Sequence, residues 1–253
     1  MSFGTVVGAF CVVCVAASVA LVYAVHDYHR RHPAAGGPEV QSLFVSGALT
    51  FFGFFSAFMI VTTWSEYSQG LSAVSVEGSS LVAVYRLSRD LPDPLNRRMR
   101  ALCIEYAEAM VKEEWPAMRR GESSPTAWQT VAEMWRILPT TPSEGLSDLP
   151  VHEQILVQFI DMTKLRGQRL VQARSNLPAI LHAVLALSAL IVIGAIIGLD
   201  MRDVRSHAIK VGVMALLVSL ALATVWALDQ PYSRGITIPP SSFELALRIM
   251  KGR

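Results

Sequence analysis

Four long stretches of the chain contain no Asp, Glu, Lys or Arg, and they limit what the sequence can fold into. They cover residues 3–25, 43–64, 177–199 and 211–228 of the 253. An α-helix needs about 20 consecutive apolar residues to cross roughly 30 Å of hydrocarbon. Charged residues make up 17% of the chain, against about 25% in soluble domains. The sequence therefore predicts an all-α integral membrane protein with four transmembrane helices.

The first stretch differs from a secretory signal peptide, because no basic residue precedes it and its apolar run is too long. We expect a retained membrane anchor. Tyr23, Trp64 and Trp226 lie near the ends of three stretches, where aromatic rings usually sit at the headgroup level.

Residues 65–176 have the charge of an ordinary protein surface and a helical pattern throughout. Apolar residues from Tyr67 to Tyr85 recur at steps of four and three, so the second span is expected to continue as one rod until Pro92 and Pro94. The predicted organisation is a first transmembrane pair (1–64), an inserted helical domain (65–176), a second pair (177–228) and a C-terminal tail (229–253).

Within the inserted domain we expect a helix over 95–120 and a turn in which Ser124 caps a helix that begins at Pro125. A loop over 139–150 then leads to a last helix from Val151 to Leu170. The one stretch of the chain with some strand character is Gly235 to Ile238.

An even number of spans places both ends of the chain and the inserted domain on the same side of the membrane. Basic residues near the two short loops (26–41 and 200–210) and near the domain are almost equally frequent, so the positive-inside rule does not orient the chain. The single Cys103 and the lack of Asn-x-Ser/Thr sequences in the domain favour a cytoplasmic domain.

The sequence offers little for metal or nucleic-acid binding. Cys11 and Cys14 lie in an apolar stretch and are best explained by packing. His26, His29 and His32 could bind a metal but more simply form a solvated flank. We expect no metal and no cofactor. The net charge of +2, without a basic stripe, gives no reason to expect a nucleic-acid partner.

Catalytic motifs are also missing, so we do not expect an enzyme. There is no glycine-rich phosphate loop, no H-E-x-x-H and no G-x-S-x-G. A membrane enzyme would have to use Asp200, Asp203 and His207, which are expected in a short loop. His182 is a separate candidate, because ionisable residues inside a span often have a function.

The second span carries an aromatic stripe. Phe51, Phe54, Phe55 and Phe58 lie at i, i+3, i+4 and i+7, on one helix face. Facing the axis of an oligomer, the rings would form an apolar constriction that gates by dewetting, and their positive edges would favour anions. Alternatively, the four rings pack against lipid or neighbouring helices.

Two charged clusters of the inserted domain allow two interpretations each. Arg97, Arg98 and Arg100 could attract anions in a vestibule, or they could form a solvated helix face. Glu113 and Glu114 are likewise expected on a charged helix face unless they line that vestibule.

Five groups of residues resemble motifs of the bestrophin-like family of mostly bacterial membrane proteins. They are Gly53, Phe58, Trp64 and Tyr67; Glu77, Leu81, Tyr85-Arg86-Leu87 and Leu91-Pro92; Tyr106 with Glu114-Trp115-Pro116; Arg169-Leu170, Ala173-Arg174 and Leu177-Pro178; and Leu228-Asp229-Gln230-Pro231-Tyr232 with Gly235.

Kinship with bestrophins implies a homo-oligomeric channel for small anions such as chloride, a pentamer whose second helices line the pore. It implies Phe51, Phe54, Phe55 and Phe58 as pore residues. The resemblance to a mostly bacterial family also implies a bacterial inner membrane. The acidic calcium clasp of calcium-activated bestrophins is not matched, since Asp229 and Glu244 are too sparse. The alternative function is a non-conducting scaffold or signalling protein whose helical domain binds a partner.

Overall fold

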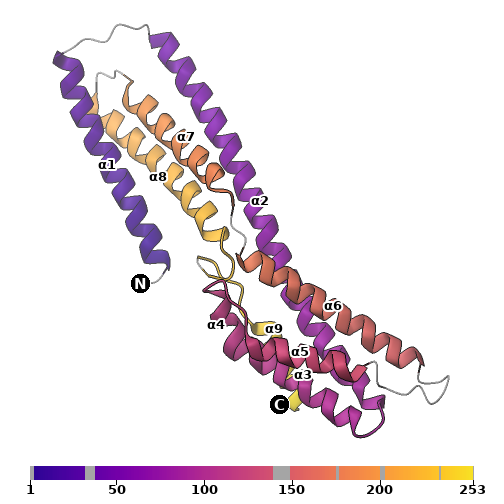
Figure 1. Cartoon of the computed structure of the whole chain (residues 1–253). Coiled ribbons are helices and arrows are strands. Elements are labelled where there is room, and N and C mark those ends of the chain that lie inside the picture. Colours follow the sequence, from indigo (N-terminus) through magenta and orange to yellow (C-terminus); the bar gives the residue numbers. More distant parts are fainter. Residues whose placement is uncertain are drawn as a thin grey trace. The chain divides into compact units, whose positions relative to one another are not determined.

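The computed structural model describes residues 3–31, 38–138, 149–174, 177–199, 203–233 and 235–252. Every regular element among them is helical (Figure 1). The chain forms two compact units. Unit 1 comprises residues 1–65 and 177–229, and unit 2 comprises residues 66–176 and 230–253.

Unit 1 contains three whole helices and the first part of a fourth, which continues into unit 2. All four are long and apolar enough to cross a membrane, as predicted. They are α1 (Phe3–Arg31), α2 (Pro38–Leu87), α7 (Ala179–Ile197) and α8 (Val204–Leu228). The core includes Phe52 and Met59 of α2, Val192 of α7 and Val211 of α8. Helix α8 lies against α1, where a Cβ on Gly212 would meet a methyl carbon of Val19 at 3.4 Å. Such small residues allow helices to approach closely in a membrane.

The fourth helix begins at Val204 rather than at the predicted Val211. The Asp203 carboxylate accepts a hydrogen bond from the Arg205 N–H (3.1 Å) and so caps the helix in the expected loop. His207, predicted to lie in that loop, is instead helical and buried. Asp200, the third candidate of that loop, lies outside the described residues.

Helix α2 is a single helix of 50 residues, which confirms the predicted continuous rod. Hydroxyl groups within its apolar part bond to its own backbone; Thr63, for example, donates to the Met59 carbonyl (2.9 Å). In hydrocarbon this avoids the cost of an unpaired polar group. The helix tightens into a 3₁₀ turn, η1 (Ser88–Asp90), just before the predicted stop at Pro92.

Unit 2 combines the C-terminal part of α2, residues 66–87, with five further α-helices and one π-helical turn among the described residues. They are α3 (Leu95–Ala109), the π turn η2 (Met110–Glu114), α4 (Trp115–Met118), α5 (Pro125–Ile137), α6 (Leu149–Arg174) and α9 (Ser241–Lys251). Ser124 caps α5 by accepting from the Ala127 N–H (3.1 Å), and Pro125 opens the helix, as predicted.

The predicted helix over 95–120 is interrupted by the π turn. Pro116 provides the physical reason, because its ring has no N–H to donate to the Lys112 carbonyl and would clash with that oxygen in a regular helix. The wider turn removes the clash. It also turns Glu114 and Trp115 into the core, where both are buried.

The segment Gly235 to Ile238 is not a strand; instead the Ile238 carbonyl accepts from the Trp115 indole N–H (2.9 Å). Helix α9 was not predicted, and its Phe243, Ala246 and Met250 are buried. The predicted loop lies outside the described residues from 139 to 148.

The core of unit 2 is built around buried charges. The Arg169 guanidinium is fully buried and binds the Glu77 carboxylate with two hydrogen bonds, Nε–Oε2 at 2.9 Å and Nη2–Oε1 at 3.0 Å. Tyr106 donates its hydroxyl proton to the same carboxylate (2.7 Å). The Arg169 guanidinium also lies over the Trp115 ring, 4.8 Å from its centroid. We call Glu77, Tyr106, Glu114, Arg166 and Arg169 the buried charge network.

The second half of the network pairs Glu114 with Arg166. Arg166 Nε and Nη2 donate to the two Glu114 carboxylate oxygens at 2.9 and 3.1 Å. Glu114 also accepts from the Ser124 N–H (2.8 Å) and lies 3.5 Å from Arg169 Nη2. Two carboxylates thus face two guanidiniums, and the buried network is electrically neutral. The prediction that Glu114 lies on a charged surface was wrong.

Burial and these charges shift two pKa values within the network. Burial, followed by the negative charge of Glu77, raises the pKa of Tyr106 well above its ordinary value, so the phenol remains protonated. Burial alone would lower the pKa of Arg169, but the Glu77 carboxylate raises it above its ordinary value. Tyr106 and Arg169 therefore keep their protons across the physiological pH range.

We predict that Arg169→Met lowers the free energy of unfolding of unit 2 by about 3–5 kcal/mol, because it leaves the Glu77 carboxylate buried without a counter-charge. Removing both partners in Glu77→Met/Arg169→Met should cost less. The readout is maleimide labelling of Cys103 in urea, in a chain with Cys11→Ala and Cys14→Ala. Cys103 is fully buried and burial raises its thiol pKa to about 12, so it reacts only after unfolding.

Arg97→Met is the matched control, because the Arg97–Asp93 pair is exposed and should contribute less than about 1 kcal/mol. Equal urea midpoints for Arg169→Met and Arg97→Met would contradict the structural role of the network.

The contact between α3 and α9 should weaken in acid. Hydrogen bonds from Lys112 and Lys251 lower the pKa of Glu108 to about 2 from its ordinary 4.5. A depressed carboxyl pKa means that the stabilisation is present above pH 4.5 and is lost as the pH falls toward 2. We predict that Glu108→Gln lowers the melting temperature at pH 6 and that its difference from the native chain shrinks by pH 2.5. A difference that is constant over this pH range would contradict the assignment.

Candidate functional site

The aromatic stripe lies on the part of α2 that belongs to unit 1. Phe51, Phe54 and Phe58 project from the unit, with exposed fractions of 55%, 77% and 57%. Phe55 is only half exposed and packs against the apolar core of unit 1. The four residues therefore share a face, but Phe55 lies at its border with the core.

The rings of Phe51 and Phe55, one helical turn apart, stack on each other. Their rings are parallel within 4° and their centroids are 5.9 Å apart. Next to the stripe, Phe52 is buried in the core of unit 1, to which α7 and α8 also contribute side chains. One side of α2 thus holds the unit together, while the outer rings remain available to lipid or to another copy of the chain.

The three predicted vestibule arginines lie in the first two turns of α3, each in a different environment. Arg97 pairs with Asp93 (3.3 Å), and Arg98 pairs with Glu133 of α5. The Arg100 guanidinium lies 4.4 Å above the centre of the Tyr85 ring and donates to the Tyr85 hydroxyl (2.7 Å). Two of the three positive charges are therefore matched by carboxylates, which reduces the attraction that the cluster can exert on an anion.

His182, the ionisable residue of the third span, has a partner that sequence reasoning missed. Its Nε2 atom lies 3.5 Å from Oδ2 of Asp229, the first carboxylate after the fourth span. Asp229 is buried, and its Oδ1 accepts a hydrogen bond from the Leu177 N–H (2.9 Å). A histidine in one span and an acidic residue directly after another form the sequence signal for this pair, because the two helix ends lie together.

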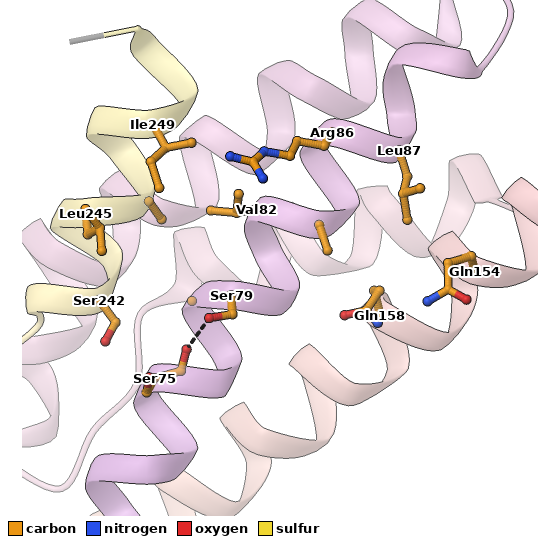
Figure 2. Close-up of a pocket in the computed structure, with 13 residues that line it drawn as sticks. Ser75, Ser79, Val82, Arg86, Leu87, Gln154, Gln158, Ser242, Leu245 and Ile249 are labelled. Carbon is orange, nitrogen blue, oxygen red and sulfur yellow. Dashed lines mark hydrogen bonds between the residues drawn. The ribbon is translucent and has the colours of Figure 1, made fainter.

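Unit 2 has an open groove of about 540 Å³ between α2, α6 and α9. Figure 2 shows Ser75, Ser79 and Arg86 of α2 in the middle of the view, with α9 on one side and Gln154 and Gln158 of α6 on the other. Arg86 is the one charged residue among those that line the groove. The groove mixes neutral polar groups with the apolar side chains of α9, and no acid–base pair converges in it.

Metal-binding groups do not converge in the described part of the chain either, where no three His, Cys, Asp or Glu side chains are placed to hold an ion. His32 of the predicted histidine cluster lies outside that part. The strongest polar assembly is the buried charge network, which is closed to solvent.

Comparison with solved structures shows which fold these helices form. Three structures of a bacterial bestrophin homologue from Klebsiella pneumoniae superpose with TM-scores of 0.71, 0.73 and 0.72, at 13%, 12% and 13% sequence identity. The alignments cover 96%, 98% and 100% of this chain and 98–99% of the homologue. At such low identity the likeness establishes the fold, and the chain has the bestrophin fold.

Comparison with curated proteins found no match. The family comparison is decisive, because the sequence profile of the Bestrophin-like domain matches residues 12–243, nearly the whole chain. This confirms the resemblance to the bestrophin-like family. Three of the residues quoted for it, Glu77, Glu114 and Arg169, meet in the buried charge network. The chain belongs to the bestrophin-like family of membrane proteins.

Proposed function

We propose that the chain forms an oligomeric, anion-permeable channel in the bacterial inner membrane, with the aromatic face of α2 lining the pore. The observation that carries the proposal is the exposure of Phe51, Phe54 and Phe58 on a membrane-spanning helix of a bestrophin-like protein. Helix α2 uses its opposite face for the core of unit 1. Copies of the chain arranged around an axis, as a homopentamer, would bring the exposed rings together.

In this proposal residues 65–176 form a helical domain inserted between the second and third spans, on the cytoplasmic side. That domain would supply the vestibule, with the 229–253 tail on the same side. Arg100 is the strongest of the three vestibule candidates, because Arg97 and Arg98 are already paired with carboxylates. Small anions such as chloride would be the permeant species, and positive ring edges would favour them in the constriction.

We predict that Phe58→Ala raises the rate of chloride efflux from liposomes that contain the purified protein. The smaller side chain widens an apolar constriction whose dewetting limits conduction. Phe54→Ala should act in the same direction. The measurement is chloride release after addition of a potassium ionophore, compared with empty liposomes at equal lipid content.

Leu190→Ala is the matched control for these variants. Leu190 is a large apolar residue of α7, 70% exposed, outside the stripe, and its loss should leave efflux unchanged. Efflux that is the same in the native chain, Phe54→Ala and Phe58→Ala would remove the stripe from the pore. No efflux from the native chain would favour the scaffold alternative.

We also predict that the detergent-solubilised protein has the mass of a ring of five 27.7 kDa chains. The measurement is light scattering on a size-exclusion column, corrected for bound detergent. A monomer or dimer would contradict the proposed pore, since two α2 helices cannot enclose a central axis.

A further inference from the structure

A cavity of about 400 Å³ lies in unit 1 between α1, α7 and α8. Apolar side chains make up most of its wall, among them Phe10 of α1, Leu185 of α7 and Trp226 of α8. His182 is the one ionisable residue in the wall. Mostly apolar walls with one or a few convergent polar groups are typical of sites for small molecules.

The cavity lies near one end of the spans. Its wall takes residues from the beginning of α1, the beginning of α7 and the end of α8. A molecule in it can therefore keep an apolar part inside the transmembrane unit and a polar group near the boundary. This arrangement suits an amphiphile that enters from the lipid.

The polar group in the cavity wall is the His182 imidazole, and Asp229 determines which of its nitrogens is free to bind such a molecule. Oδ2 of Asp229 lies 3.5 Å from His182 Nε2, and Oδ1 of the same carboxylate is already engaged by the Leu177 N–H. A carboxylate favours the imidazole tautomer that carries the proton on the nitrogen facing it. In the neutral ring the other nitrogen, Nδ1, then carries a lone pair and acts as a hydrogen-bond acceptor.

The negative charge of Asp229 limits which head group an amphiphile in this cavity can carry. The Asp229 carboxylate is only 8% exposed, so its charge is weakly screened and disfavours a second anion beside it. A cationic head would have to give up its hydration against apolar walls. A neutral hydroxyl group, by contrast, can donate its proton to Nδ1 at little cost.

We propose that this cavity binds an uncharged, hydroxyl-bearing lipophile of the long-chain alcohol or monoacylglycerol class, whose hydroxyl donates to His182 Nδ1. The apolar chain lies against Phe10, Leu185 and Trp226. This site is independent of the proposed pore, because none of its residues belongs to α2.

The test uses the contact of the ligand with Trp226. The probe is 9,10-dibromostearyl alcohol, whose bromine atoms quench tryptophan fluorescence at contact, added to the full-length protein in nanodiscs. We expect saturable quenching that is lost in Trp226→Phe. Loss of one hydrogen bond in His182→Leu should weaken binding about tenfold, while His182→Asn, which keeps an acceptor, should bind more tightly than His182→Leu.

Two further variants separate the cavity from the lipid around it. Ala186→Phe places a ring in the wall of the cavity and should abolish saturable quenching. Ala183→Phe, exposed on the same helix outside the wall, should bind like the native chain. Quenching that is unsaturable, or equal in Ala186→Phe and Ala183→Phe, would show that the alcohol only partitions into lipid and would overturn the proposal. Equal or tighter binding of 9,10-dibromostearic acid would overturn the assignment of the head group.

Discussion

The contact between Arg169 and Glu77 is the constraint on which the rest of unit 2 depends. It joins α6 to α2, and Glu114 extends it to the π turn and the cap of α5. Each charge would be costly to bury alone, so all of the partners have to be in place together. The network thus specifies how the helices of unit 2 must be arranged, and it adds little net stability of its own.

Unit 1 is held together by other means, because lipid provides no hydrophobic driving force between helices. Its contacts are close packing, as at Gly212, and polar groups satisfied within the helices or at their ends. The pair of His182 and Asp229 is such an end contact, and it sets the chemistry of the neighbouring cavity. This pair lies at the ends of α7 and α8, while the stripe on α2 is purely aromatic.

Much of the fold could be predicted from the sequence. Apolar runs defined the four spans, and the absence of a breaker before Pro92 defined the long α2. The cap at Ser124 followed from local chemistry. The π turn could not be predicted in this way. The effect of Pro116 on the preceding turn depends on the buried partners that Glu114 finds in the core, Arg166 and Ser124. Helix α9 was not predicted because its apolar pattern is short and the helix is stabilised by packing against α3, a contact that the local sequence does not show.

The candidate site was predictable only in part. Helical spacing correctly grouped the phenylalanines on one face, but only the fold distinguishes the half-buried Phe55 from the exposed Phe54 and Phe58. Spacing also grouped Arg97, Arg98 and Arg100, yet their partners come from other turns and helices. Local sequence specifies which face a side chain shares, whereas long-range contacts decide whether its charge is available.

The proposed anion conduction rests on the bestrophin-like fold and on the exposed aromatic face of α2. The most direct test is the reversal potential of currents through planar bilayers that contain the purified protein, under a gradient of potassium chloride. Anion permeation predicts a reversal potential close to the equilibrium potential of chloride. Reversal near the equilibrium potential of potassium would contradict anion selectivity, and a bilayer without protein-dependent current would contradict the channel itself.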